Sequence, residues 1–396
     1  MDPEKLQAII DWLIDGASSA AQPEQVMAEL AERLTACGLP LARAAVLVRT
    51  LHPQFMGRRF SWRPGQGVEV GTAPHETLLG PTFLDSPVRR VYETGAPLRR
   101  RLADPGCPRD FPLLHELAAE GMTDYFALPL RFSNGEVHVA SWSTKQPGGF
   151  TDAQTAAIVA VTVPLARVSE VRALRRTAVN LLNTYVGNNA GERILAGQIR
   201  RGETQAIHAA IWLSDMRGFT QLADRLPSQQ LIDVLNRYFD CQVPPIQEHG
   251  GEVLKFMGDG LLAIFRAARD GPELGAACAG ALAAARQART NVAETDTELA
   301  VPRFGLALHV GEVLYGNIGS GTRLDFTCIG PAVNLAARLE KLAAGLGRTV
   351  VVSADFSRHC GAALAPIGEF PIRGFRTAQW VFGLPEEAAS SPGGDP

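Results

Sequence analysis

The stretch Glu252-Val-Leu-Lys-Phe-Met-Gly-Asp-Gly-Leu-Leu-Ala-Ile-Phe265 has the pattern of two strands joined by a tight turn, with Asp259 at the tip. Upstream, the apolar run 209–213 indicates another strand and is followed by Asp215. Strand ends hold side chains rigidly, and a two-metal site needs rigid carboxylates because its ions must stay roughly 3.5–4 Å apart. The two segments therefore predict a site for two Mg²⁺ ions, with Mn²⁺ as the alternative metal.

The residues after Asp215 predict a cradle for a triphosphate. Gly218 allows a tight turn, and a helix expected at 221–226 would point free backbone N–H groups at anionic oxygens. Phosphoryl transfer depends on alignment and charge stabilisation, so metals and a cation can supply its rate without a histidine or serine nucleophile.

A further cluster lies in the segment 323–340. Its first half alternates as a strand does, and Gly330 and Pro331 mark a turn and the first position of a helix. Asn334 and Arg338 are four residues apart and share one face of that helix. An amide beside a guanidinium can hold a ribose oxygen and neutralise charge on an α-phosphate.

From about residue 208 to residue 384, the chain resembles the catalytic domain of class III nucleotidyl cyclases. The resemblance rests on Ser-Asp-Met-Arg-Gly-Phe-Thr (214–220), Leu-Lys-Phe-Met-Gly-Asp-Gly (254–260) and Gly-Pro-Ala-Val-Asn-Leu-Ala-Ala-Arg (330–338), in family order. It covers somewhat under half of the chain. It implies an α+β catalytic domain of the ferredoxin-like βαββαβ type, with extra strands toward its C-terminal end. The implied reaction is that of an adenylate cyclase, in which the ATP 3′-oxygen attacks the α-phosphorus to give cyclic AMP and pyrophosphate.

The resemblance assigns a role to each matching position. The residues implied at the metals are Asp215, Met216 and Asp259. The residues implied in substrate binding are Gly218, Phe219, Thr220, Lys255, Thr327 and Arg373. The residues implied in orienting the ribose and stabilising the transition state are Asn334 and Arg338. Thr327 stands where mammalian members have an aspartate and many bacterial members a threonine.

The choice of base depends on hydrogen-bond donors and acceptors. The Lys255 ammonium is a donor suited to adenine N1, whereas guanine carries a proton on N1 and needs an acceptor such as glutamate. Lysine therefore argues against GTP. Guanylate cyclases carry a cysteine at the position of Thr327, and Cys328 is one residue out of register with it.

The chain departs from the family pattern in two places. Where the family often has a phosphate-binding lysine in a Lys-Gly-Lys element, the chain reads Phe-Pro-Ile-Arg-Gly-Phe-Arg (370–376). Arg373 or Arg376 is the candidate substitute, and Phe375 cannot serve. Pro331 replaces a polar residue, but proline is well tolerated at the start of a helix.

The resemblance also implies a head-to-tail homodimer. One subunit would present the metal aspartates and the other the base-reading and transition-state residues, so Lys255 and Asp259 of one chain would serve two different sites. Two alternatives remain, a catalytically silent nucleotide-binding scaffold and a guanylate cyclase. A diguanylate cyclase is disfavoured because its Gly-Gly-Asp/Glu-Glu-Phe hairpin is missing.

Composition is that of a folded protein with two domains. The chain has 396 residues, of which 46% are hydrophobic, and a net charge of −3, so neither disorder nor a polyanionic partner such as nucleic acid is expected. The run Arg99–Arg101 is interpreted as solvated surface. Six scattered cysteines without a Cys-x-x-Cys pair indicate a reducing compartment. With no signal-peptide pattern and no apolar stretch of membrane-spanning length, a cytoplasmic protein without membrane insertion is expected.

The N-terminal half has the pattern of a separate α+β domain. Helical periodicity is found at 24–37 and 83–95, and strand patterns at 44–50, 125–131 and 136–142. The order of these elements resembles GAF domains, which implies a sensor or dimerisation domain with an unidentified small-molecule ligand. Four histidines and two tryptophans are candidate ligand contacts, but a surface or hydrogen-bonded position is commoner for such histidines and a buried core position for such tryptophans. They are His52, His75, His115, His138, Trp62 and Trp142.

A helix is expected to join the two domains. Val171, Leu174, Ala178, Leu181 and Tyr185 alternate spacings of three and four, as in a coiled-coil seam that pairs with a second copy, although such a stripe can also pack on its own domain. The glycines at 187 and 191 are hypothesised to form a joint. The expected organisation is a GAF-like domain at 1–165, a helical linker at 166–205, a cyclase domain at 206–385 and a disordered tail at 386–396.

Overall fold

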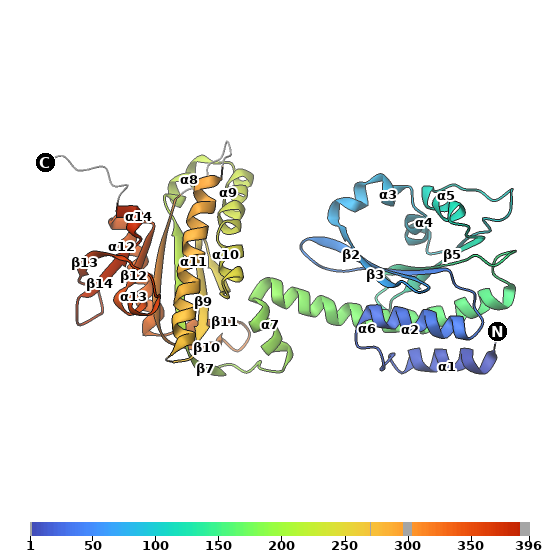
Figure 1. Ribbon diagram of the computed structural model, residues 1–396, viewed down its shortest axis with the longest axis horizontal. Coiled ribbons are helices and arrows are strands. Elements are labelled where there is room, and N and C mark those ends of the chain that lie inside the picture. The colour runs from blue at the N-terminus through green and yellow to red at the C-terminus, as the bar shows by residue number, and fades with distance from the viewer. Residues whose placement is uncertain (1, 270, 296–302, 389–396) are drawn as a thin grey trace. The chain divides into compact units, whose positions relative to one another are not determined.

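An antiparallel sheet organises the first half of the chain (Figure 1). Its strands lie in the order β3-β2-β1-β6-β5-β4. Their bounds are β1 Arg43–Arg49, β2 Phe55–Arg63, β3 Gly67–Pro74, β4 Leu98–Arg100, β5 Asp124–Arg131 and β6 Val137–Thr144. The computed structural model describes residues 2–269, 271–295 and 303–388. It divides the chain into two compact units, Met1–Leu181 and Leu182–Pro396.

Helices cover both faces of this sheet and bury two cores. The larger core joins the sheet to α1 (Pro3–Ile14), α2 (Pro23–Ala36) and α6 (Asp152–Val186), and it contains Trp62 and Trp142. The smaller core joins the opposite face to α4 (Pro87–Thr94) and α5 (Pro112–Ala119). The tryptophans are therefore core residues. This α+β arrangement agrees with the expected strands and with the helix at 24–37.

The helix expected at 83–95 is wrong as a single element. The structure has a short 3-10 helix η1 (His75–Leu79), then α3 (Pro81–Leu84), and a new helix begins at Pro87. The Ser86 hydroxyl accepts a hydrogen bond from the backbone N–H of Arg89 at 3.1 Å, and Pro87 occupies the first turn. A serine cap followed by proline is a strong helix start, and it outweighs the continuous apolar periodicity.

The basic run of the N-terminal unit is engaged within the fold. The Arg99 guanidinium pairs with the buried carboxylate of Asp124 at 2.7 Å, and Arg100 pairs with Asp110 at 2.6 Å. Both arginines therefore have intramolecular anionic partners.

The second unit contains an eight-stranded sheet. Its strands lie in the order β13-β14-β12-β10-β7-β9-β8, and β11 pairs with β10. Their bounds are β7 Thr204–Met216, β8 Glu252–Met257, β9 Gly260–Ala267, β10 Phe304–Gly319, β11 Leu324–Ile329, β12 Val350–Ser353, β13 Ala365–Phe370 and β14 Gln379–Gly383. The four strands β10-β7-β9-β8, with helices after β7 and β9, form the expected βαββαβ core.

Helices also cover both faces of the second sheet. One face packs against α9 (Ser228–Asp240), α10 (Val243–Glu248) and α11 (Pro272–Glu294). The other packs against α7 (Asn188–Leu195) and α12 (Pro331–Gly345). The remaining short helices are α8 (Phe219–Arg225), α13 (Ala354–His359) and α14 (Pro385–Ala388). Among the described residues, no helix has both the length and the apolar character needed to span a bilayer.

The segment expected as a linker is shared between the two units, because the division falls inside α6. The predicted seam does not pack on its own sheet: Val171, Leu174 and Tyr185 are 66%, 60% and 79% exposed. Residues 386–388 of the expected tail belong to α14, and 389–396 lie outside the described residues.

The two glycines of the hypothesised joint serve close packing. Gly187 has a φ of +87° at the start of α7, a conformation that favours glycine. A Cβ on Gly191 would lie 2.5 Å from Asn183 Oδ1 and 3.2 Å from Leu182 Cβ, on the last turns of α6. Replacing Gly191 would therefore disturb packing within the second unit, whatever its effect on motion.

Candidate active site

Asp215 and Asp259 are brought together by strand pairing. Asp215 lies near the end of β7, and Asp259 lies in the turn between β8 and β9, which pairs with β7. Gly260 follows Asp259 and packs so closely that a Cβ there would lie 3.4 Å from Asp215 Oδ1. Burial, and then the neighbouring Asp259 carboxylate, raise the pKa of Asp215 to about 6. Two carboxylates therefore face each other across one pair of strands.

This arrangement fits a divalent cation. Carboxylates that repel each other in a half-buried position are stabilised by a bound cation, and Mg²⁺ takes only one or two protein carboxylates beside water and substrate oxygens. Within the described residues, no group of three or more His, Cys, Asp and Glu side chains could hold a metal ion without such additional ligands. The Met216 side chain is buried in the core, while its backbone N–H donates a hydrogen bond to the Asp215 carboxylate.

An ion pair between a partly exposed arginine and a buried glutamate lies beside the two aspartates and was not predicted. Arg217, directly after the strand, contacts Glu340 of α12 with 3.3 Å between Nη1 and Oε1. Burial raises the pKa of Glu340, Arg217 lowers it, and Asp215 adds to the rise. Gly305 on β10 makes room for the pair, since a Cβ there would overlap the Arg217 guanidinium. We call Asp215, Asp259, Arg217 and Glu340 the carboxylate site.

The turn after β7 has the expected glycine. Gly218 adopts a left-handed conformation with a φ of +72°, and α8 begins directly after it, two residues earlier than the expected 221. Phe219 packs partly against the core of the unit, and Thr220 is exposed. Gly218, Phe219 and Thr220 thus form the turn and the first residues of the helix that follow Asp215, and Thr220 is open to solvent.

Lys255 on β8 lies near β11, the strand that contains Thr327 and Cys328. The pairing of β8 with β9 shifts register between Val253 and Lys255, and such a bulge re-aims the side chains that follow it. Lys255 is close enough to Cys328 to lower the pKa of that thiol, which burial raises to about 11. Thr327 is buried, and its hydroxyl has no hydrogen-bond partner among the described residues.

A second polar network ties α7 to the strand that carries Lys255. Glu252, at the start of β8, is buried and accepts hydrogen bonds from Tyr315 Oη at 2.8 Å and from Asn189 Nδ2 at 3.0 Å. The Arg266 guanidinium lies 4.5 Å from the centre of the Tyr315 ring. Both oxygens of Glu252 are thus satisfied, one from β10 and one from α7, and the sequence analysis missed this network.

The other predicted residues lie on exposed surfaces. Asn334 and Arg338 share the outer face of α12, and both are exposed. Arg373 is exposed in the turn between β13 and β14. Among the described residues, none of the three side chains makes a hydrogen bond or ion pair. The neighbouring Phe375 packs against the core.

Comparison with known proteins identifies the second unit. Residues 203–382 match the family described as the adenylate and guanylate cyclase catalytic domain. The uncharacterized protein Rv1319c of Mycobacterium tuberculosis is 35% identical over 176 residues, which are 43% of this chain and 31% of that protein. The uncharacterized protein Rv1320c of the same organism is 33% identical over 179 residues, which are 43% of this chain and 30% of that protein. The match spans about a third of these relatives.

Solved structures of nucleotide cyclases are also similar. A bacterial light-regulated adenylyl cyclase is 25% identical with a TM-score of 0.48, over 56% of this chain and 64% of that chain. The adenylyl cyclase CyaB from P. aeruginosa is 26% identical with a TM-score of 0.39, over 46% and 94%. The guanylyl cyclase Cya2 is 28% identical with a TM-score of 0.38, over 46% and 95%. From the family match, residues 203–382 are a class III adenylate/guanylate cyclase catalytic domain.

Proposed function

We propose that the protein is an adenylate cyclase that converts ATP to 3′,5′-cyclic AMP and pyrophosphate at sites shared by two copies of the chain. The observation that carries the proposal is the pair Asp215 and Asp259, held by neighbouring strands within the matched cyclase domain. Two carboxylates held this close in a half-buried position favour a bound divalent cation over two bare carboxylates.

The reaction forms a bond between the ribose 3′-oxygen and the α-phosphorus and breaks the bond to the oxygen that bridges to the β-phosphorus. The 3′-hydroxyl proton is released, and pyrophosphate leaves. Two Mg²⁺ or Mn²⁺ ions, held by Asp215, Asp259 and the backbone of Met216, would supply charge neutralisation and activation of the 3′-oxygen. Arg338 neutralises charge on the α-phosphate, and Asn334 orients the ribose.

Lys255 and Thr327 support adenine as the base. The lysine ammonium donates to adenine N1, and the threonine hydroxyl can accept from the exocyclic amine. That hydroxyl is buried without a described partner, which costs about 1–3 kcal/mol and is expected where a ligand supplies the partner. Guanine would place its N1–H against the lysine ammonium, so GTP is the second candidate substrate.

The surface of the chain supports a homodimer. Asn334 and Arg338 are exposed although the proposed chemistry needs both, so we assign them to the site of a second copy. The exposed apolar stripe on α6 supplies a seam for the same partner. The N-terminal unit, which we propose to be GAF-like, would then regulate how the two copies meet.

The test is cyclic nucleotide production by the purified chain, with ATP and GTP in parallel under Mg²⁺ and under Mn²⁺. We expect cyclic AMP from ATP, no product from Asp259→Ala, and loss of the preference for ATP in Lys255→Glu. A preference of the unaltered chain for GTP would overturn the assignment of substrate. No product from either nucleotide, at concentrations where a dimer is measured, would instead support a silent nucleotide-binding scaffold.

A further inference from the structure

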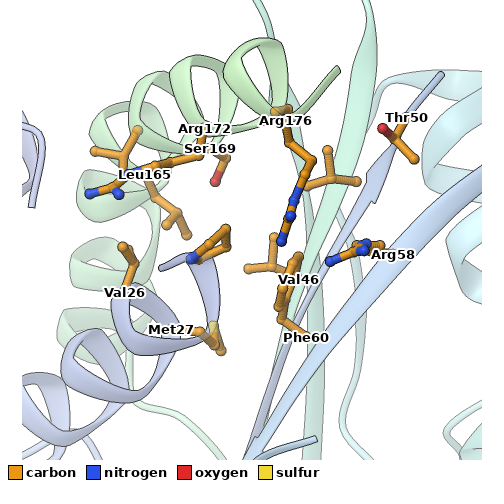
Figure 2. Close-up of a pocket in the computed structure, with 14 residues that line it drawn as sticks. Val26, Met27, Val46, Thr50, Arg58, Phe60, Leu165, Ser169, Arg172 and Arg176 are labelled. Atoms are coloured by element: carbon orange, nitrogen blue, oxygen red, sulfur yellow. The ribbon is translucent and has the colours of Figure 1, made fainter. Parts of the chain in front are cut away.

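A pocket opens between the sheet of the N-terminal unit and the two helices α2 and α6 (Figure 2). Its cavity volume is about 60 Å³, so the pocket admits only a slender ligand. Apolar side chains form most of the wall: Val26, Met27, Val46, Phe60 and Leu165. They come from α2, β1, β2 and α6, so the pocket exists only in the folded unit.

Two arginines at this pocket lack anionic partners. Arg58 extends from β2 and Arg176 from α6, and Figure 2 shows both side chains at the pocket. Among the described residues, neither guanidinium makes a hydrogen bond or an ion pair, and Arg58 lies over the Phe55 ring at 5.4 Å. Burial, and then Arg176, lower the pKa of Arg58, while Glu24 acts in the opposite direction without forming an ion pair. Two cations are thus held near each other against apolar walls.

Polar atoms in the same pocket are also left unsatisfied. Thr50 Oγ1 and Arg58 Nε are buried and have no hydrogen-bond partner within the described parts of the chain. Leaving such groups unpaired is costly, so a native structure retains them mainly where a ligand or water completes them. Arg58 on β2 pairs with Val48 of β1, and Thr50 directly follows the last residue of β1, so both groups lie at the same end of this strand pair.

A third arginine that lines the pocket, Arg172, has a structural role. Arg172, one turn before Arg176 on α6, donates hydrogen bonds to the backbone carbonyls of Ala20 and Ala21. Its guanidinium ties α6 to the segment between α1 and α2. Within the described parts of the chain, Arg58 and Arg176 make no such contacts, which leaves their donors available to a ligand.

We propose that this pocket binds an organic monocarboxylate with an apolar tail. The carboxylate lies between Arg58 and Arg176 and accepts from the Thr50 hydroxyl, and the tail lies among the apolar side chains of α2, the sheet and α6. This assignment does not rest on the cyclase activity proposed above.

The chemistry of the pocket separates this ligand class from others. A planar carboxylate matches guanidinium donors and relieves the repulsion between two cations. A neutral apolar molecule would leave both guanidiniums unpaired, and a small hydrophilic anion would leave the apolar wall unused. The ligand therefore needs both an anionic end and an apolar body.

Isothermal titration calorimetry of the full chain with octanoate, 1-octanol and acetate tests the proposal. We expect octanoate to bind at least about tenfold more tightly than 1-octanol, and acetate to give no measurable heat, because only octanoate uses both parts of the pocket. Arg58→Gln and Arg176→Gln should each weaken octanoate binding about tenfold or more. Arg175→Gln is the matched control, since Arg175 is the exposed neighbour on α6 and does not line the pocket.

Each contrary outcome overturns a stated part of the proposal. Failure of octanoate to bind rejects the site, and equal affinity for octanoate and 1-octanol rejects the role of the arginines. Binding of acetate as tight as that of octanoate rejects the role of the apolar wall. Leu165→Trp fills the wall without altering a charge, so undiminished octanoate binding by this variant, with its fold verified by circular dichroism, would place the ligand elsewhere.

Discussion

The two faces of α12 carry different parts of the proposed active site. On the inner face, Glu340 is buried and paired with Arg217, next to Asp215 and Asp259. On the outer face, Asn334 and Arg338 are exposed and make no described contact. One helix thus completes the carboxylate site of its own chain while presenting two polar side chains away from it. Under the proposed function, a single chain would hold half of a site in a rigid form and display the other half to a second copy.

The largest effect is expected when two defective chains are mixed, which tests whether the two faces of α12 serve different sites. Asp259→Ala and Arg338→Ala should each lower cyclase activity about 100-fold or more, because each removes charge stabilisation of the transition state. Co-expressed with different tags, the two variants should regain about a quarter of the unaltered activity, since half the dimers would contain one intact site.

The control for this experiment combines two defects on the same side. Asp259→Ala mixed with Asp215→Ala should show no recovery, because every site in such a mixture lacks one of the two aspartates. If the mixture of Asp259→Ala with Arg338→Ala is as inactive as either variant alone, while heterodimers are measured by tandem purification, the sites are not shared between chains.

A smaller effect, on the free energy of unfolding, is expected when the ion pair on the inner face of α12 is removed. Arg217→Met leaves Glu340 buried without its cation and should lower the free energy of unfolding by about 3 kcal/mol. The double variant Arg217→Met/Glu340→Leu should regain most of that loss, because no charge remains buried. Urea denaturation followed by circular dichroism measures both.

The exposed ion pair of Arg358 and Asp355 is the matched control for this change. Arg358→Met should cost less than about 1 kcal/mol, because solvent screens a surface pair. If Arg217→Met costs no more than Arg358→Met, the buried pair does not hold α12 against the end of β7.

The smallest effect concerns the sheet beneath both faces. His309 on β10 is buried against Ser353, and burial lowers its pKa from 6.5 to about 4. Because the unfolded chain takes up the proton first, stability is fully present above about pH 6.5 and is lost as the pH falls toward 4, by about 2 kcal/mol at pH 5. Urea denaturation at pH 6.5 and at pH 5 measures the free energy of unfolding of the unaltered chain and of His309→Gln. It should fall less between these two pH values in the variant. Equal pH dependence in the two proteins would mean that folding does not lower the pKa of His309.

Local pattern was sufficient for much of the catalytic unit. The hairpin around Asp259, the strand before Asp215 and the helix that begins at Pro331 all follow from period-two apolar spacing and from glycine and proline at turns. Contacts between distant segments were not predictable in this way. Arg217 and Glu340 are 123 residues apart, and neither has a pattern that names the other.

In the N-terminal unit, too, sequence patterns did not predict everything. A continuous apolar period predicted one helix at 83–95, but the local cap at Ser86 and Pro87 divides it. The arginines of the pocket were also not identified, because Arg58 beside Arg59 in a strand and Arg176 beside Arg175 in a helix both have the pattern of solvated surface. Their approach across two elements is visible only in the fold, where no described residue forms an ion pair with either of them.

Short-range spacing and turn chemistry specify the order of the motifs, the βαββαβ framework and the pair of aspartates, so these features could be predicted from the sequence. Tertiary structure alone decided which side chains share an environment. It paired Arg217 with Glu340, re-aimed Lys255 through a bulge, turned Asn334 and Arg338 outward, and enclosed Arg58 within an apolar pocket. The physical reason is that charge, burial and unpaired donors depend on distances between segments, and those distances arise only when strands pair and helices pack.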